Sequence, residues 1–357
     1  MTLGLVDRGS EISTDLIATK LSDKHDILVL SAGKLSQKKY QHQQVSGPDI
    51  PPPPAPDNFF QKILFRLGLN QASREGVMFT NNSLSAIKKF NPEVIIAVNG
   101  SSQLKLIRRE FPKVKTVVFG RAGIGHDDLA SLHARPDLFI ALTPQALTWA
   151  VKHAHSNTKT IHIPNPINIK PFQSAKPAEI DLVRPIIFTV GALTSYKNIP
   201  SVIKAVSYLK SSLLLIGSGE LEDEITQDLS QLDNEFSWIK HLEPSKLPAY
   251  YRASHIFCFT PDPQEAFGRV YLEAMAAGLP IVASDDPIRR KIIGNSGYFV
   301  DPHDSVDIAR GIERAVKGKR KIDYTEDLKP YNLATVVNSI EKELEELEEN
   351  VSTSNIG

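Results

Sequence analysis

Two glutamates, Glu265 and Glu273, stand with seven residues between them in the segment PQEAFGRVYLEAMAAGLPIVASD. If a helix begins near Gly268, Glu273 lies in its second turn and Glu265 lies in the loop before it. The amides at the start of that helix then point outward, namely those of Phe267, Gly268, Arg269 and Val270. Such a helix N-terminus suits a phosphate or sugar hydroxyls. Exposed glutamates are common on any surface, but that explanation does not account for the whole segment.

A second candidate site is the loop GRAGIGHDDLAS, residues 120–131, which follows an apolar run typical of a strand. Glycine-rich loops at the carboxyl ends of strands are where α/β sheets bind ligands. His126 is the candidate residue, which orients an acceptor or contacts a donor phosphate; a loop histidine with no role is an equal alternative. The adjacent Asp127 and Asp128 suggest a metal, yet the chain contains no Asp-x-Asp sequence.

Short apolar runs alternate with helix-length amphipathic segments through most of the chain, which predicts βαβ units and parallel sheets. In the first half we expect strands at 3–6, 26–30, 93–98, 114–119, 137–142 and 159–163. In the second half we expect them at 185–190, 212–217, 255–260, 279–284 and 297–301. So many strands exceed one small open sheet, so the pattern favours two doubly wound domains.

Length and composition are those of an ordinary globular protein, with 357 residues and 41% hydrophobic residues, and the length suggests two domains. The single cysteine, Cys258, excludes an intrachain disulfide and a cysteine-rich zinc site; it lies in an apolar run, which predicts a buried, inert thiol. No apolar run is long enough to span a membrane, and the first residues do not resemble a signal peptide. We therefore expect a cytoplasmic protein.

The formal net charge is zero, which argues against a nucleic-acid-binding protein. The charges are nevertheless uneven, because residues 1–172 carry +8 and the remainder carries −8. This asymmetry suggests that the basic half contacts a polyanion or an anionic membrane; mutual attraction of the two halves is the alternative. The segment Phe59–Leu67 follows a proline-rich stretch at 46–58 and has the pattern of a basic amphipathic helix. It either lies on a membrane or packs on its own sheet, and packing is the favoured interpretation.

The segment EAFGRVYLEAMAAGLPIV resembles the signature of the group-one retaining glycosyltransferases, glycosyltransferase family four, which have the GT-B fold. The resemblance continues through FTVGALTSYKNIPSVIKAV, LLLIGSGELEDEI, LPAYYRASHIFCFTP and GYFVDPHDSVDIARGI, in that order over about residues 185–315. The segment IPNPINIKPF resembles the end of the family's first domain. This ordered series is far more specific than any single motif.

The resemblance implies a role for several further residues. Glu265 takes the place of the glutamate beside the donor sugar, and Glu273 that of the glutamate on the ribose hydroxyls. Lys197, which follows the phosphate strand ending at Gly191, takes the place of the lysine on the donor diphosphate. The amides of Phe267, Gly268, Arg269 and Val270 hold the donor sugar and phosphate. Base recognition is expected through backbone groups around Leu242.

The sequence departs from the family pattern at three positions. Ala192 stands where many members have a second cation on the diphosphate, which leaves Arg269 or Arg121 as candidates to supply it. The first glycine loop is reduced to VDRGSE, in which Gly9 is the plausible equivalent, and Asn168 replaces an aspartate between the domains.

We therefore expect two Rossmann-like doubly wound domains of the GT-B class facing a cleft. The first covers residues 1–172 and binds a glycan or lipid-linked acceptor; the second covers 173–330 and binds a nucleotide-diphospho-sugar. A terminal helix in 331–357 crosses back to the first domain. The resemblance implies transfer of a hexosyl group with retention, without cofactor or metal, in glycan, polysaccharide or glycolipid synthesis. A sugar-nucleotide or sugar-phosphate converting enzyme, or a non-catalytic partner subunit, remains an alternative.

Overall fold

The computed structural model describes residues 2–5, 8–47, 70–98, 100–318 and 321–354, without the side chains of 126 and 350–354. The chain divides into two compact units. Unit 1 comprises Met1–Pro166 and Leu333–Gly357, and unit 2 comprises Ile167–Asn332. The predicted amphipathic helix at 59–67 lies outside the described residues. Within them, no helix is both long enough and apolar enough to cross a bilayer.

Unit 1 contains a four-stranded parallel sheet whose strands follow one another in sequence order. These strands are β3 (Val94–Val98), β4 (Lys115–Gly120), β5 (Leu138–Ala141) and β6 (Lys159–His162). A separate parallel pair joins β1 (Leu28–Ser31) to β2 (Gln41–Gln44). Helix α1 (Gly9–Leu21) precedes these strands, and the helices between them are α3 (Gln71–Phe90), α4 (Ser101–Glu110), α5 (His126–His133) and α6 (Pro144–His153).

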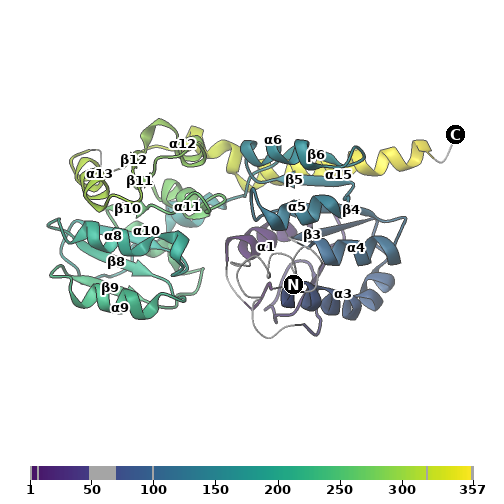
Figure 1. The fold of residues 1–357 in the computed structure, drawn as a ribbon, viewed down its shortest axis with the longest axis horizontal. Helices are drawn as coiled ribbons and strands as arrows, with labels where there is room; N and C mark the ends of the chain where they lie inside the picture. Colours follow the sequence, from purple (N-terminus) through teal and green to yellow (C-terminus); the bar gives the residue numbers. More distant parts are fainter. Residues whose placement is uncertain (1, 6–7, 48–69, 99, 319–320, 355–357) are drawn as a thin grey trace. The chain divides into compact units, whose positions relative to one another are not determined.

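The last helix, α15 (Leu333–Ser354), completes the core of unit 1. Its buried residues Val336, Val337 and Ile340 pack with α1 and with the inner strands β4 and β5. Figure 1 shows this helix, in yellow, alongside strands that precede it by about two hundred residues. Lys24 and Lys159 add ion pairs to glutamates of the helix, which are Glu341, Glu343 and Glu346.

Unit 2 contains a six-stranded parallel sheet with the order β12-β11-β10-β7-β8-β9. The strands are β7 (Ile186–Val190), β8 (Ser212–Ile216), β9 (Phe236–Ile239), β10 (Ile256–Phe259), β11 (Ile281–Ser284) and β12 (Tyr298–Val300). The chain builds outward from β7 in one direction and then returns to its other side with β10. This reversal places a topological switch point at the carboxyl ends of β7 and β10, where open α/β sheets bind ligands.

The helices of unit 2 precede, connect and follow these parallel strands. They are α7 (Ile169–Ser174), η1 (Ser195–Lys197), α8 (Ile199–Val206), α9 (Glu222–Ser230), α10 (Leu247–Ala253), α11 (Arg269–Ala277), α12 (Pro287–Ile293), η2 (Gly294–Ser296), α13 (Ser305–Lys317), α14 (Thr325–Leu328) and η3 (Lys329–Tyr331). The unit begins six residues before the expected boundary, because α7 packs here: the ring of Phe172 lies edge-on to Tyr251, 5.5 Å between centroids.

Ten of the eleven predicted strands are present, and they include every strand that is buried along its whole length. Residues 3–6 do not form a strand in the described part, since Gly4 and Leu5 form a turn. Two strands have no counterpart in the predictions: the polar β2 pairs only with β1, and β9 lies at the sheet edge. Edge strands need no continuous apolar run, so the apolar pattern did not reveal them. Cys258 lies in β10 and is buried as predicted.

Candidate functional site

The candidate site of unit 2 gathers at the carboxyl ends of β7 and β10. Gly191 directly follows β7, and η1 then places Lys197 near the switch point. Residues 261–267, which we call the Glu265 loop, follow β10 and lead into α11. The ammonium of Lys197 forms an ion pair with Glu265 Oε2, and both side chains are largely buried, with exposed fractions of 17% and 12%. The structure therefore brings together a carboxylate and a lysine that are 68 residues apart.

The other carboxylate oxygen of Glu265 faces the start of α11. Its Oε1 accepts the backbone N–H of Gly268 at 2.9 Å and that of Phe267 at 3.3 Å. Two of the four amides that we expected to hold a donor are thus bound to Glu265 itself. Burial raises the pKa of Glu265, but Lys197, Arg289 and the Phe267 amide outweigh it, so the pKa falls below its usual value. The residue is therefore a carboxylate near neutral pH.

Gly268 permits the sharp turn from this loop into α11. Its φ of +80° is in the left-handed region, and a Cβ there would lie 2.5 Å from the ring of Tyr271. The Tyr271 hydroxyl in turn donates to the carbonyl of Phe259 at the end of β10, at 2.6 Å. A side chain at position 268 would therefore displace both the turn and the packing of α11 on the sheet.

Glu273 forms a separate, buried cluster one turn into α11. Its carboxylate accepts from the Tyr251 hydroxyl at 3.0 Å and from Arg269 Nε at 3.2 Å, and the residue is 4% exposed. Burial and the adjacent carboxylate raise the pKa of Tyr251 well above its usual value, so this hydroxyl remains a donor. Both oxygens of Glu273 thus have protein partners, and a ligand hydroxyl must share or replace one of them.

Arg269 has a guanidinium nitrogen available for a ligand. Its Nη1 is buried and has no hydrogen-bond partner among the described residues. The side chain is 10% exposed and starts from the first turn of α11. Arg121, the other candidate cation, belongs to unit 1, where its Nη1 donates to Asn165 Oδ1 at 2.5 Å.

The remaining predicted residues are Val270 in α11, Leu242 after β9, and Gly9 and His126 in unit 1. Val270 is in the first turn of α11, and its carbonyl accepts from the Tyr251 hydroxyl at 3.3 Å. Leu242 follows β9, at the edge of the sheet two strands from β7. Gly9 begins α1 and His126 begins α5, both in unit 1.

The loop before α5 is held by Asp128. Asp128 is 1% exposed and accepts the backbone N–H groups of Ala122 and Gly123. Burial, with a smaller contribution from Asp127, raises the pKa of Asp128 to about 7. Among the described residues, no three histidine, cysteine or acidic side chains gather as metal ligands would.

Several residues that hold the site were not predicted. Arg289 is fully buried and donates to the backbone carbonyl of Glu265, and the Asn198 amide donates to the carbonyls of Thr260 at 3.0 Å and Pro302 at 2.6 Å. The spacing of Arg289 with the buried Ile292 and Ile293 on α12 is a signal that the arginine faces inward.

Residues 172–332 match the family model described as "Glycosyl transferases group 1". The chain is 30% identical over 124 residues to the O-antigen chain mannosyltransferase B of Escherichia coli, which covers 32% of each protein. The chain spans about a third to a half of the length of the curated relatives it matches first. The resemblance seen in the sequence is therefore confirmed over the part that forms nearly all of unit 2.

Two solved structures extend the comparison to the fold of almost the whole chain. Sucrose-phosphate synthase from Thermosynechococcus elongatus superposes with a TM-score of 0.76 at 17% identity, covering 96% of this chain and 94% of that one. HepE from Anabaena, in complex with UDP-glucose, gives 0.68 at 16% identity and covers 96% and 97%. The predicted fold class, α/β with two parallel sheets as in GT-B structures, is confirmed.

Proposed function

We propose, from the match of residues 172–332 to the group 1 glycosyltransferase model, that this protein transfers a hexosyl group from a nucleotide-diphospho-sugar to an acceptor hydroxyl, with retention. The observation that carries the proposal is the ion pair of Lys197 with Glu265 at the carboxyl ends of β7 and β10, inside the matched region. A cation and a carboxylate at a switch point suit the two ends of a sugar diphosphate.

In this proposal Lys197 binds the diphosphate and stabilises the charge that develops as it departs. Gly191 lets the diphosphate approach the end of β7. Glu265 lies beside the sugar, binds its hydroxyls and faces the anomeric carbon, where positive charge develops. The bond from that carbon to the phosphate oxygen breaks, the bond to the acceptor oxygen forms on the same face, and the acceptor proton passes to the departing phosphate.

We assign Glu273 and Arg269 to the nucleotide end of the donor. Glu273 accepts from the ribose hydroxyls, sharing its oxygens with its present partners. Arg269 supplies the second cation that Ala192 lacks, because its Nη1 is buried and unpaired among the described residues. A buried donor without a partner is costly, and a phosphate oxygen would satisfy it. The amides of Phe267, Gly268, Arg269 and Val270 bind the donor once Glu265 turns toward the sugar, and the backbone near Leu242 reads the base.

Unit 1 is proposed to bind the acceptor, with Gly9 and His126 on its glycine-containing loops. We propose an acceptor that is a growing glycan or a lipid-linked glycan. The support is the relative named as an O-antigen chain mannosyltransferase. The reaction needs no resident cofactor, and HepE in complex with UDP-glucose makes uridine diphosphate sugars the first donors to test.

We also propose a cytoplasmic protein with a weak, peripheral contact between unit 1 and anionic lipid. The +8 of residues 1–172 is largely cancelled within unit 1, because α15 brings six glutamates and one lysine. Residues 1–166 and 333–357 together hold 21 Lys/Arg and 19 Asp/Glu. The remaining attraction is small and screened by salt. Flotation with anionic vesicles at low and high salt tests it, and no binding at low salt would contradict it.

Release of nucleoside diphosphate from a panel of nucleotide sugars, with and without glycan acceptors, tests the proposed activity. We expect acceptor-stimulated release from one donor class, and a product with the donor's anomeric configuration by NMR. Interconversion of the sugar nucleotide without an acceptor would identify the converting enzyme instead. Donor binding without any turnover would identify a non-catalytic subunit.

A further inference from the structure

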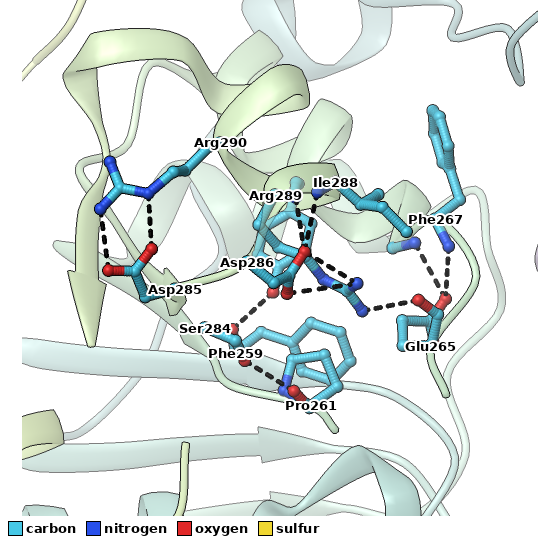
Figure 2. A network of polar contacts seen from close by, with 12 residues as sticks. Phe259, Pro261, Glu265, Phe267, Ser284, Asp285, Asp286, Ile288, Arg289 and Arg290 are labelled. Carbon is cyan, nitrogen blue, oxygen red and sulfur yellow. Dashed lines mark hydrogen bonds and ion pairs between the residues drawn. The ribbon is translucent and has the colours of Figure 1, made fainter. Parts of the chain in front are cut away.

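Arg289 is a fully buried cation behind the Glu265 loop. Its side chain is 0% exposed and extends from α12, whose N-cap is Asp286. Asp286 Oδ1 accepts the backbone N–H groups of Ile288 at 2.9 Å and Arg289 at 3.0 Å. Arg289 Nη1 lies 3.4 Å from the same carboxylate (Figure 2). The guanidinium is therefore fixed by the helix terminus from which it starts.

The second terminal nitrogen of the guanidinium, Nη2, is hydrogen-bonded to the Glu265 loop. Arg289 Nη2 donates to the backbone carbonyl of Glu265 at 2.7 Å, as Figure 2 shows. At the other end of the loop, the Ser284 hydroxyl donates to the carbonyl of Pro261 at 2.6 Å. Two groups from β11 and α12 thus hold the main chain on both sides of the turn that carries Glu265.

A contribution to the free energy of unfolding does not by itself explain a buried arginine at this position. Burying a guanidinium costs several kcal/mol, and a well-packed apolar side chain at such a site is often as stable or more stable. Arg289 is hydrogen-bonded to one carboxylate, to one backbone carbonyl and to the Tyr271 side chain, and its Nε has no hydrogen-bond partner among the described residues. What an apolar residue could not do is hold the carbonyl of Glu265 in place.

We propose that Arg289 is a positioning residue that fixes the Glu265 loop in the conformation needed for transfer. This inference rests on the proposed function of Glu265. Arg289 does not contact the donor, because it is fully buried. It acts through Glu265 by holding the main chain so that the carboxylate meets Lys197 and the amides that start α11. Its charge also supplements that of Lys197 at a site where Ala192 supplies none.

The charged and titratable groups around Glu265 come from three elements. Lys197 belongs to η1, Arg289 and Asp286 to α12, and Tyr271 to α11. Arg289 is one of the groups that lower the pKa of Glu265. Removing its charge therefore raises that pKa, and activity that needs the carboxylate is lost at a higher pH.

The test compares Arg289→Met and Arg289→Lys with Arg290→Met. Arg290 is the matched control: it is the next residue of the same helix, is 56% exposed and pairs with Asp285 at 2.5 Å, away from Glu265 (Figure 2). We expect kcat to fall about 10²-fold in Arg289→Met, the effect of a misplaced catalytic group. Arg289→Lys keeps the charge but cannot make both contacts, so its kcat should lie between those of Arg289→Met and the wild type.

Two further measurements separate positioning from a general loss of folded protein. In a plot of kcat against pH, the fall in kcat on the acid side should move to higher pH in Arg289→Met but not in Arg290→Met. Hydrogen exchange of peptides covering 261–268 should accelerate in Arg289→Met while peptides from α8 and α13 keep wild-type rates.

Unchanged exchange in the loop overturns the inference whether or not a donor is known. Faster exchange with wild-type kcat and an unshifted pH profile also overturns it. Equal losses in Arg289→Met and Arg290→Met would assign the effect to α12 as a whole. A wild-type protein that acts on no nucleotide sugar contradicts the proposed function and the catalytic part of this inference, while the exchange result still decides whether Arg289 holds the loop.

Discussion

The Lys197 ammonium and the Glu265 carboxylate form an ion pair with each other, which any donor must displace if it binds here as proposed. The ion pair is largely buried, and the second oxygen of Glu265 is held by the amides of Phe267 and Gly268. If Lys197 and Glu265 bind the donor as proposed, a diphosphate must draw the ammonium away from the carboxylate, and the donor sugar must replace the amides as partners of Glu265. Binding therefore exchanges one set of charge-assisted contacts for another, which limits affinity and favours discrimination among ligands.

Replacement of Lys197 tests the diphosphate assignment. Lys197→Met should lower kcat about 10²-fold, by analogy with the loss of one transition-state donor. Lys329→Met is a control in the same unit, since Lys329 is 64% exposed and its ammonium pairs with Glu326. Steady-state kinetics with the identified donor measure both variants. Near wild-type transfer by Lys197→Met would show that another cation carries the diphosphate.

The two glutamates should differ in the parameter that they affect. Glu265 is proposed to face a centre where charge develops, so Glu265→Gln should mainly lower kcat. Glu273 is proposed to bind the unreactive ribose, so Glu273→Gln should mainly weaken donor binding. Glu273→Gln should also destabilise unit 2 by about 1–3 kcal/mol, because it leaves the buried Arg269 without its carboxylate. Calorimetry, kinetics and urea unfolding separate the three effects. A harmless Glu265→Gln would remove the transferase assignment of this site.

The types and spacing of Glu265 and Glu273 in the sequence identified them as candidate site residues, but the sequence could not show which groups they contact. The helix N-terminus at Gly268 follows from a glycine before a regular helix, and α11 begins at Arg269. The occupation of the Phe267 and Gly268 amides by Glu265 depends on how the loop turns back, which no residue pattern encodes. Arg289 and Tyr251 come from other elements, so their approach to Glu265 and Glu273 is a product of tertiary packing.

At the scale of elements, apolar runs were a good guide to strands buried on both faces. β7, β8, β10 and β11 are fully buried along their length and were all predicted. β9 has mixed exposure and was not predicted. Periodicity reports burial and only indirectly reports backbone pairing, so strands of polar or mixed exposure, such as β2 and β9, can escape it.

The contribution of α15 to unit 1 should come from its apolar face. Ile340 is fully buried in the core that joins α15 to α1 and β4, so Ile340→Ala should cost about 3 kcal/mol. Lys159 pairs with Glu343 and Glu346 at 2.6 Å each but is 41% exposed, so Lys159→Met should cost about 0.5 kcal/mol. Urea unfolding of unit 1 measures the loss of unfolding free energy in Ile340→Ala and in Lys159→Met. A larger loss for Lys159→Met would show that the ion pairs hold the helix.

The loop before α5 should make unit 1 sensitive to pH. The pKa of Asp128 rises from 3.8 to about 7 in the folded state, so the native protein binds this proton more tightly than the unfolded chain. The contribution of this proton to the unfolding free energy is fully present below pH 4 and is lost as the pH rises toward 7. Asp128→Asn should flatten the fall in unfolding free energy between pH 5 and 7, measured in urea. An equal slope in both proteins would contradict the shifted pKa.

At the scale of the whole molecule, a nucleotide ligand should stabilise one unit more than the other. The chain has two tryptophans, Trp149 in unit 1 and Trp238 in unit 2. Trp149→Phe therefore leaves a reporter in unit 2, and Trp238→Phe leaves one in unit 1. Ligand at 100 times its Kd should add about 2.7 kcal/mol to the unfolding free energy of unit 2. Equal shifts from both reporters would mean that the units unfold together, and no shift in either would contradict donor binding.

The division of the chain also governs the order in which the protein can be completed during synthesis. Unit 2 lies wholly within residues 167–332, and a β-bridge joins Ile167 to Asn332 where the chain enters and leaves it. Unit 1 starts first, yet its core lacks Val336, Val337 and Ile340 until α15 has been made. Domains usually fold from the N-terminus as they emerge from the ribosome. Here unit 2 can fold before unit 1. Until α15 is made, unit 1 exposes the apolar residues that α15 would cover, and we expect a chaperone to bind it during that interval.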